Sequence, residues 1–109
     1  MRKWVVSSAV SGLMLAGFLA AADKKEGDAA KGKEVFDQCA VCHNTDNDEK
    51  KIGPSLKGLF KRDKLKNGKP VNVENVKAVI NAGGNGMPSY ADLISEAEKT
   101  NVIAYLKTL

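Results

Sequence analysis

Residues 39–43 read Cys-Ala-Val-Cys-His and form a C-x-x-C-H motif. Positions three apart point the same way on a helical turn, so the thiols of Cys39 and Cys42 can each reach one vinyl group on the same edge of a porphyrin. His43, directly after them, is then held beside the iron as an axial ligand. The motif therefore predicts one covalently attached haem c.

Three other interpretations of the motif are open. A thioredoxin-like redox pair places C-x-x-C beside a βαβ pattern, and this chain has no alternating strand pattern of useful length. A structural zinc site requires four protein ligands, whereas the sequence offers two cysteines and one histidine. The third is a chance occurrence, which is uncommon in an exported helical chain. Haem attachment is the interpretation that we expect.

The second axial ligand is sought by elimination. His43 is the only histidine of the sequence, which excludes ligation by two histidines of the chain. The other two methionines are the initiator and one in the N-terminal apolar segment, which leaves Met87. Met87 lies between Gly86 and Pro88, residues that allow a close backbone approach and fix its direction. A His43/Met87 pair is expected; the alternatives are a Met87 that only fills the core, with lysine or an open position at the iron.

The N-terminal segment, residues 1–22, is typical of a secretory signal peptide. Arg2 and Lys3 precede an uncharged, largely apolar stretch that ends in three alanines. An uncleaved membrane anchor is the alternative, because the stretch is close to the length that spans a bilayer. In both cases the chain that follows is exported, since the positive residues stay inside. We therefore expect a bacterial periplasmic protein that contacts the membrane only if this segment is retained.

A chain of 109 residues has room for one small domain and excludes a multi-domain enzyme. The core that residues 23–109 can build is marginal in size, so a cofactor is the expected additional stabiliser. The net charge of +4 includes Arg2 and Lys3 of the N-terminal segment. What remains lacks the strongly basic, aromatic face of a nucleic-acid binder. We expect a monomer with no nucleic-acid partner.

The pattern of apolar residues predicts three main helices after a polar linker at residues 23–28. The first covers residues 29–38, with Asp28 as its N-cap. The second lies between Asn72, another capping residue, and Gly83, which begins a glycine pair that stops it.

The third helix opens with a capping box, Ser95 and Glu98, and continues to the C-terminus. A further short helix is expected at residues 55–60. The predicted fold is therefore all-α, with about three main helices, short helices and long loops. The apolar stripe of the last helix consists of Val102, Ile103, Leu106 and Leu109.

The order of motifs along residues 29–109 resembles that of class I cytochromes c, which carry a single haem. The haem motif is followed by Ile-Gly-Pro at residues 52–54, by Met87-Pro88, and by residues 103–107, which are similar to the last helix of the family. This order is more specific than any one motif. The resemblance implies a small cytochrome c fold in which helices and loops wrap around one covalent haem.

The resemblance also implies roles for single residues. In the family, the carbonyl of the loop proline orients the ligand histidine, a role that falls to Pro54 here. Gly32 corresponds to a glycine where the first and last helices cross closely. Arg62 corresponds to an arginine that supports a haem propionate, with a solvated side chain as the alternative. Many relatives place a tryptophan near a propionate, and Tyr90 is only a weak substitute for it here.

The resemblance implies an electron carrier and not an enzyme, because an iron with both axial positions filled has no site for a substrate. One electron is expected to pass by outer-sphere transfer through the exposed haem edge, at a positive potential raised by apolar surroundings and the thioether ligand. The residues expected around the haem are Phe36, Leu56, Leu59, Phe60, Val79, Ile80 and Leu106.

The expected partners are redox proteins: a cytochrome-containing reductase or a dehydrogenase as donor, and a terminal oxidase or reductase as acceptor. A basic run between Lys57 and Lys69 suits an acidic patch on such a partner, although a solvated loop is an equal alternative. A second class of function is a five-coordinate haem protein that binds gas or reduces peroxide. It requires Met87 to be absent from the iron or easily displaced.

Overall fold

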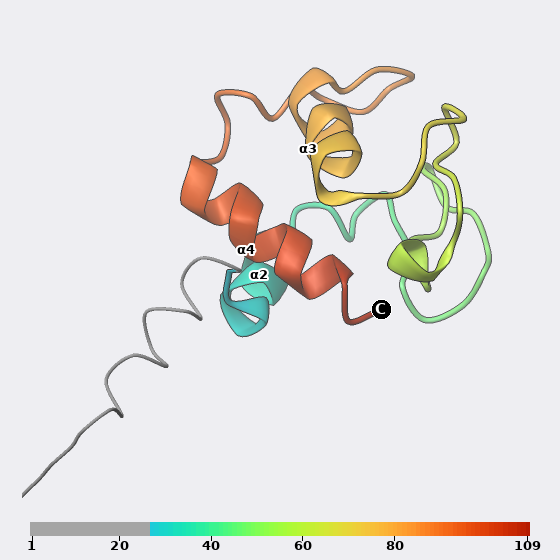
Figure 1. Ribbon diagram of the computed structural model, residues 1–109, viewed down its shortest axis with the longest axis horizontal. Coiled ribbons are helices and arrows are strands. Elements are labelled where there is room, and N and C mark those ends of the chain that lie inside the picture. The colour runs from blue at the N-terminus through green and yellow to red at the C-terminus, as the bar shows by residue number, and fades with distance from the viewer. Residues whose placement is uncertain (1–26) are drawn as a thin grey trace, which may run out of the picture.

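The computed structural model describes residues 27–109, which contain three α-helices, one 3₁₀-helix and no β-strand. In chain order these are α2 (Ala29–Phe36), η1 (Leu59–Lys61), α3 (Val73–Ala82) and α4 (Glu96–Leu106). Helix α4 contacts both α2 and α3, and most of the long loop that contains η1 lies to the right of the helices in Figure 1. The expected all-α class is confirmed.

The expected signal peptide at residues 1–22 and most of the linker at 23–28 lie outside the described residues. Within residues 27–109, no helix combines the length and the apolar composition needed to cross a membrane.

Asp28 begins α2 and also fastens it to α4. Its side chain accepts hydrogen bonds from the backbone N–H groups of Ala30 and Lys31, which confirms the expected N-cap. Its own backbone N–H donates to Oδ1 of Asn101 on α4 at 2.8 Å. One residue therefore closes the helix start and ties the two helices together.

The crossing of α2 and α4 depends on Gly32. A Cβ atom at this position would overlap the backbone carbonyl of Asn101 and lie 3.0 Å from Cβ of Tyr105. One turn further along α2, the ring of Phe36 packs against Tyr105 with centroids 5.3 Å apart. The implied close crossing at Gly32 is confirmed, because no side chain fits between the two backbones.

The starts of α3 and α4 are capped as their sequences predict. Asn72 accepts a hydrogen bond from the N–H of Asn75, and α3 ends at Gly83. Ser95 and Glu98 form the complete reciprocal capping box of α4.

A buried lysine fastens α4 to the segment before it and to α3. Lys99 is only 2% exposed, and its ammonium donates to the carbonyl of Ala91 at 3.0 Å and to Oε2 of Glu96 at 2.8 Å. The other oxygen of Glu96 pairs with Lys77 of α3 at 2.6 Å. Lys99 thus fastens the last part of the segment between α3 and α4 to helix α4.

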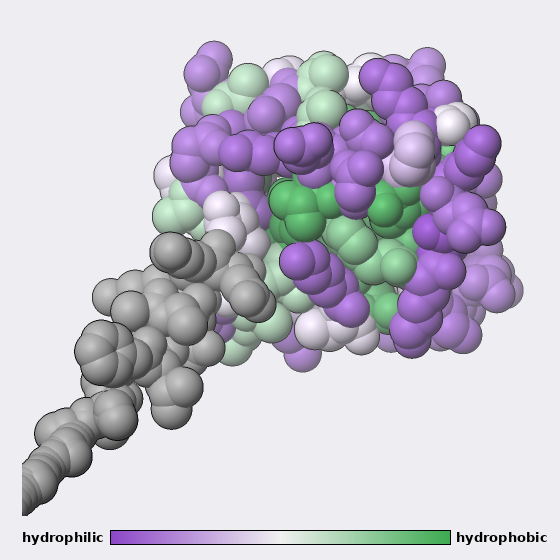
Figure 2. Space-filling view, viewed as in Figure 1, coloured by the Kyte–Doolittle hydropathy of each residue, from purple (hydrophilic) through white to green (hydrophobic). Residues whose placement is uncertain are grey.

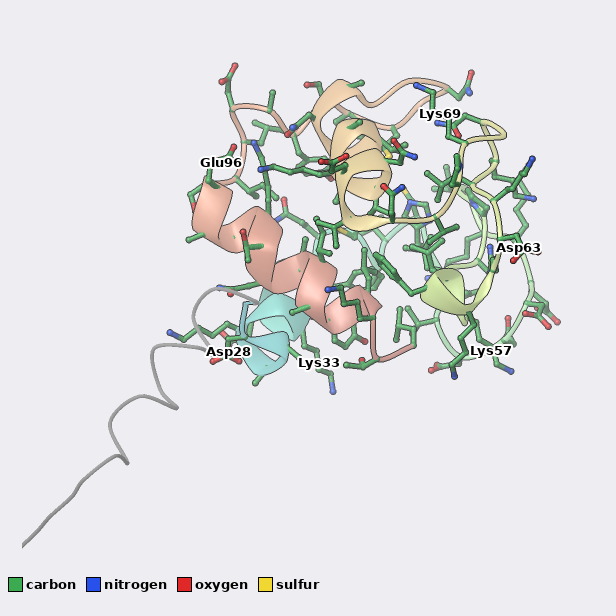
Figure 3. The ribbon with its side chains drawn as sticks, in the orientation of Figure 1. Asp28, Lys33, Lys57, Asp63, Lys69 and Glu96 are labelled. Atoms are coloured by element: carbon green, nitrogen blue, oxygen red, sulfur yellow. The ribbon has the colours of Figure 1, made fainter. Side chains whose placement is uncertain are left out.

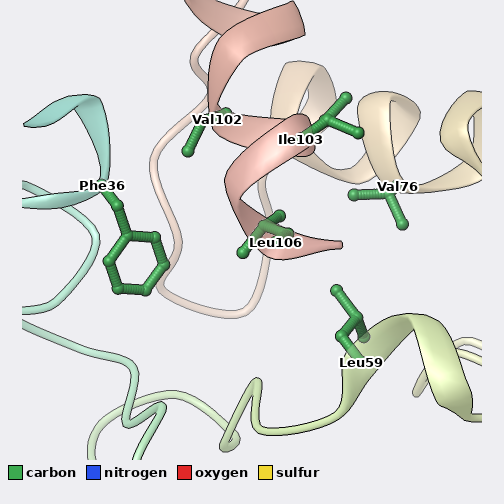
Figure 4. Packing of buried hydrophobic residues seen from close by; sticks show 6 residues of the cluster. All are labelled: Phe36, Leu59, Val76, Val102, Ile103 and Leu106. Carbon is green, nitrogen blue, oxygen red and sulfur yellow. The ribbon is translucent and has the colours of Figure 1, made fainter. Parts of the chain in front are cut away.

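The hydrophobic core gathers where the helices meet (Figure 4). Phe36 faces α4 from α2, while Val76 of α3 and Leu59 of η1 approach α4 from other directions. The stripe expected on the last helix is confirmed for three of its four residues, and Leu109 is half-buried beyond the helix end. The buried core cluster consists of Phe36, Leu59, Val76, Val102, Ile103 and Leu106.

Two expected helices differ from the observed ones. The first ends at Phe36 and not at residue 38, and the chain continues in turns into the haem motif. The helix expected at residues 55–60 is a single 3₁₀ turn, Leu59–Lys61. Two features explain its shortness. The Ser55 hydroxyl accepts from the Lys57 N–H and donates to a carbonyl of the preceding loop, and Gly58 has a left-handed φ of 66°.

Candidate haem site

A cavity of about 870 Å³ opens between α3, the end of α4, the haem motif and the loops on either side of η1. Hydrophobic side chains reach the surface between α3, α4 and η1 and are surrounded by hydrophilic ones in Figure 2. The structure brings all six expected site residues together around this one cavity. They are Cys39, Cys42, His43, Pro54, Arg62 and Met87.

The haem motif extends the end of α2 as a series of turns. The N–H of Ala40 donates to the carbonyl of Phe36 at 2.9 Å, and the N–H of His43 donates to that of Cys39 at 3.0 Å. Both cysteines are half-buried and line the cavity. Burial, and secondarily the neighbouring Cys42, raise the pKa of the Cys39 thiol.

The imidazole of His43 is oriented by the loop that follows it. Its Nδ1 lies 2.7 Å from the carbonyl oxygen of Pro54. A carbonyl only accepts hydrogen bonds, so Nδ1 must carry the proton and donate, which leaves the lone pair on Nε2 free. This is the arrangement by which an outer partner fixes the tautomer of a metal-binding histidine.

Gly53 makes this arrangement possible, although sequence reasoning assigned it no role of its own. A Cβ atom on Gly53 would lie 2.6 Å from Cε1 and 2.9 Å from Nδ1 of the His43 ring. The Gly53 N–H also donates to the carbonyl of Cys42 at 2.7 Å. The ring therefore packs directly against backbone. The Gly-Pro pair in the sequence is the signal that pointed to this loop.

Met87 follows a tight two-residue turn between α3 and α4. Gly84 and Met87 exchange backbone hydrogen bonds of 2.9 and 3.0 Å. The residues between them, Asn85 and Gly86, both have positive φ values, 53° and 89°. These features define a type I′ turn, for which Asn-Gly is a preferred sequence. The backbone of Met87 is therefore fixed at the cavity by hydrogen bonds. The sequence predicted a Gly-Met-Pro loop at this place, but not these hydrogen bonds.

Arg62 lies at the cavity, and its guanidinium is engaged with the protein itself. Nη2 donates to the carbonyls of Ser55 at 3.0 Å and Lys57 at 2.7 Å. The side chain thus ties together the loop that precedes η1. Its remaining N–H groups have no hydrogen-bond partner among residues 27–109.

The apolar lining agrees with five of the seven expected residues, namely Leu56, Leu59, Val79, Ile80 and Leu106. Phe36 instead lines a second space of about 50 Å³ that shares His43 and Met87 with the larger cavity. The expectation for Phe60 is wrong, because its ring lies outside both spaces, 6.0 Å below Nζ of Lys107. Phe60 follows Leu59 directly, and the 3₁₀ turn directs the two side chains differently.

Tyr90 is a cavity residue whose importance the sequence understated. It is 9% exposed, lines both spaces, and donates its backbone N–H to the carbonyl of Ile80 at 2.9 Å. Burial, and then the nearby Cys39 and Cys42, raise the pKa of its phenol. Tyr90 therefore brings a phenol hydroxyl to a cavity wall that is mainly apolar.

These residues fit a haem. The volume lies in the range of cofactor pockets, which is about 300–1,000 Å³, and the lining is mainly apolar. Two thiols, an oriented histidine and a thioether lie on its wall. Among residues 27–109 there is no group of three or more His, Cys, Asp or Glu side chains that could hold a bare metal ion. The donor set is therefore one that suits an iron porphyrin better than a bare metal ion.

Comparisons with known proteins agree with this fit. The model of the family described as cytochrome c matches residues 29–109. Cytochrome c-550 of Bacillus subtilis (strain 168) is 38% identical over 68 residues, which are 62% of this chain and 49% of that protein. Cytochrome c2 of Blastochloris viridis is 56% identical over 36 residues, 32% of this chain and 28% of that protein. The chain thus aligns with less than half the length of these curated relatives.

Two solved structures share the fold. Cytochrome c6 from the diatom Phaeodactylum tricornutum superposes with a TM-score of 0.61 at 27% identity, covering 75% of this chain and 93% of the other. Cytochrome cH from Methylobacterium extorquens gives 0.56 at 28% identity, covering 76% and 100%.

The helices and the cavity define a small all-α haem protein. More specifically, the chain belongs to the cytochrome c family over residues 29–109, as a class I c-type cytochrome. Its cofactor is haem c, with its iron.

Proposed function

We propose that this protein carries single electrons between redox proteins, with His43 and Met87 as the axial ligands of the haem iron. Haem supplies an iron that alternates between the ferrous and ferric states. Thioether bonds from Cys39 and Cys42 hold the haem, and the electron passes by outer-sphere transfer through the haem edge. With both axial positions taken, no substrate reaches the iron, and the protein is not an enzyme.

The observation that carries this proposal is the 2.7 Å hydrogen bond from His43 Nδ1 to the Pro54 carbonyl. It leaves Nε2 as the free ligand atom and makes the imidazole a stronger donor to iron. The turn of residues 84–87, with its reciprocal hydrogen bonds, supports a sulfur ligand with a fixed backbone. A ligand pair held in this way changes little between oxidation states, which favours rapid electron exchange.

The cavity wall supports a positive potential. Its side chains are mainly apolar, and a low dielectric disfavours the additional charge of the ferric centre. A thioether ligand favours the ferrous state as well. Tyr90 and the free N–H groups of Arg62 are the donors that we propose for the haem propionates, with Arg62 acting from the loop carbonyls that hold it.

The partner surface that we propose is the basic run of residues 57–69. Lys57, Asp63 and Lys69 lie along the side of the molecule formed by η1 and the loop after it (Figure 3). The lysines of this run are exposed, and Lys66 lines the cavity together with Arg62. A donor or acceptor with an acidic patch would be steered to this side in a salt-dependent manner. The lysines concerned are Lys57, Lys61, Lys64, Lys66 and Lys69.

We propose the bacterial periplasm as the site of action. The sequence of residues 1–22 has the three-part order of an export signal. The donor would be a cytochrome-containing reductase or a dehydrogenase, and the acceptor a terminal oxidase or reductase. The protein would act as a monomer, attached to the membrane only if its first segment is retained.

The test is a potentiometric titration of the haem-loaded protein, followed by exposure of its ferrous form to carbon monoxide. A carrier should titrate as one reversible one-electron step at a positive potential, with a ferrous spectrum that carbon monoxide leaves unchanged. Rapid binding of carbon monoxide would contradict six-coordinate ligation and favour a gas-binding or peroxide-reducing protein. Absence of haem after denaturing electrophoresis would contradict attachment through the two cysteines.

A further inference from the structure

We propose that Asn85-Gly86 is a site of spontaneous deamidation, and that its β-linked aspartate product displaces Met87 from the cavity. The turn of residues 84–87 is the feature concerned. Both central residues are exposed, and both also lie at the wall of the cavity. The chemical step follows from this exposed Asn-Gly pair, whereas its effect on the haem rests on the ligation by Met87 proposed above.

The chemistry requires only water. The backbone nitrogen of Gly86 attacks Cγ of Asn85, a C–N bond forms, and the side-chain amide leaves as ammonia, which gives a five-membered succinimide. Water then adds to one of the two ring carbonyls and opens the ring. One opening gives aspartate and the other gives isoaspartate, in which the backbone runs through the former side chain. The net change is the gain of one water and the loss of one ammonia, with no oxidation or reduction.

Glycine after asparagine favours this reaction because no side chain hinders the attacking nitrogen. Within residues 27–109, the Asn85 side chain and the Gly86 N–H make no hydrogen bond. Only the flanking Gly84 and Met87 are paired. The side chain and the peptide can therefore rotate into contact without breaking a hydrogen bond of their own, and only the flanking pair between Gly84 and Met87 has to open.

The chain contains a second Asn-Gly pair that serves as an internal control. At Asn67-Gly68, Oδ1 of the asparagine accepts from the N–H of Lys69 at 2.9 Å. The Gly68 N–H donates to the carbonyl of Leu65 at 2.9 Å. The side-chain amide and the backbone N–H that must meet to form the succinimide are therefore both held by hydrogen bonds. Because two hydrogen bonds must break first, we expect deamidation at Asn67 to be on the order of tenfold slower.

The β-linked product does not fit the turn. A type I′ hairpin has two residues, and its length fixes which backbone groups pair across it. Isoaspartate inserts one additional carbon atom into the backbone between Gly84 and Met87. The two hydrogen bonds that hold Met87 cannot then both form. Plain aspartate adds no backbone atom and tolerates positive φ as asparagine does, so it leaves the turn intact.

The experiment is controlled ageing of the haem-loaded, full-length protein at mildly alkaline pH. Cleavage after glutamate places the two sites on separate peptides, residues 50–74 and 75–96. Mass spectrometry with fragmentation then follows the exchange of amide for acid at each asparagine. Labelling by a protein isoaspartate methyltransferase identifies the β-linked product. The ferric methionine-to-iron charge-transfer band is recorded on the same samples.

We expect the mass change to appear first at Asn85, and the methionine band to fall in proportion to isoaspartate. Asn85→Gly should keep the band on ageing, because glycine suits the turn and has no amide. Asn85→Asp should start with an intact methionine band. This variant introduces the negative charge without lengthening the backbone, so it distinguishes the two effects. Asn67→Gly should age like the unmodified protein.

Equal or earlier change at Asn67, or none at Asn85, would overturn the modification site. Isoaspartate at Asn85 with an unchanged band would overturn the displacement of Met87. A methionine band that is absent before ageing would refute the proposed ligation, and the mass data would still decide the modification.

Discussion

Two neighbouring residues fix the imidazole of His43. One accepts a hydrogen bond from the ring, and the other has no side chain, so the ring can pack against its backbone. The Pro54 carbonyl accepts from Nδ1 at 2.7 Å, and Gly53 leaves room for the ring beside the backbone. The first contact decides which nitrogen is available to a metal, and the second decides where the ring lies. The position of the His43 ring at the cavity is therefore set by two consecutive loop residues, Gly53 and Pro54.

The role of Gly53 can be tested by Gly53→Ala. The new Cβ would lie 2.6 Å from Cε1 of His43, so the ring or the loop must move. We expect a loss of about 1–3 kcal/mol in the free energy of unfolding, as for other overpacked positions. The haem spectrum should also change. Urea unfolding and visible spectra of the haem-loaded protein provide the two measurements.

Gly58→Ala is the matched control for Gly53→Ala. Gly58 has a φ of 66° and no heavy atom within 4 Å of a new Cβ, so its replacement introduces backbone strain without a contact. A cost of about 1 kcal/mol with an unchanged spectrum is expected. If Gly53→Ala left the spectrum equally unchanged, the close contact would have no part in placing His43.

Among the described helices, α4 is the one against which both α2 and α3 pack. It contacts α2 at Gly32 and α3 through Glu96, and it supplies half of the buried core cluster. The haem motif leaves the end of α2, and the Met87 turn leaves the end of α3. Both halves of the site are therefore placed by helices that pack on α4.

The α2–α4 crossing is tested by Gly32→Ala. Because the added methyl would overlap the Asn101 carbonyl, the helices must separate, and Phe36 would lose contact with Tyr105. We expect a destabilisation of about 2–3 kcal/mol, seen as a lower urea midpoint. The control is Lys33→Ala, an exposed position on the same helix, which should stay within about 0.5 kcal/mol. Equal effects of the two changes would contradict the close crossing.

The ion pairs of Glu96 predict a pH dependence. Hydrogen bonds from Lys77, and then Lys99, lower the pKa of Glu96 from 4.5 to about 2. Because the pKa is lower in the folded state, the ionised carboxylate stabilises the fold. This contribution is fully present above pH 4.5 and is lost as the pH falls towards about 2. Since the Glu96 side chain is largely exposed, solvent screens the effect.

We therefore expect Glu96→Gln to be less stable than the unmodified protein near neutral pH. The difference in the free energy of unfolding should shrink as the pH falls from 4.5 towards about 2. It should vanish once Glu96 of the unmodified protein is protonated and therefore as uncharged as the glutamine of the variant. Urea unfolding at a series of pH values measures it. Glu34→Gln, which removes an exposed carboxylate that forms no ion pair within the described chain, is the control. A difference that is independent of pH would contradict the ion-pair account.

The molecule as a whole has a small core and a large cavity beside it. The buried apolar cluster has six residues, whereas the cavity measures about 870 Å³. The side chains that line a cavity gain dispersion contacts from its occupant, and a domain of this size has a small core of its own. We therefore expect the haem to form part of the core as well as to carry the electron.

Loss of the haem should consequently unfold much of the domain. We expect Cys39→Ser combined with Cys42→Ser to give no haem stain after denaturing electrophoresis. Thermal unfolding followed by circular dichroism should be broad and shifted to lower temperature. An equally sharp and stable transition without haem would show that the polypeptide core suffices alone.

What the sequence predicted well is local. The caps at Asp28, Asn72 and Ser95 depend on residues within one helical turn, and all three are present. The cluster of site residues around one cavity followed from the motif and from the family resemblance. The position of Phe60 beneath Lys107 and the contact of Gly53 with the His43 ring join residues that lie well apart in the sequence. Periodicity and propensity carry no information on such contacts.

The most direct test of the account is the visible spectrum of the exported, haem-loaded protein, recorded in the ferric and the ferrous state and repeated on Met87→Ala. Ligation by His43 and Met87 predicts sharp ferrous haem c bands and a weak ferric methionine-to-iron band that disappears in Met87→Ala. A high-spin ferric spectrum in the unmodified protein, or a methionine band that survives the substitution, would contradict the proposed electron carrier.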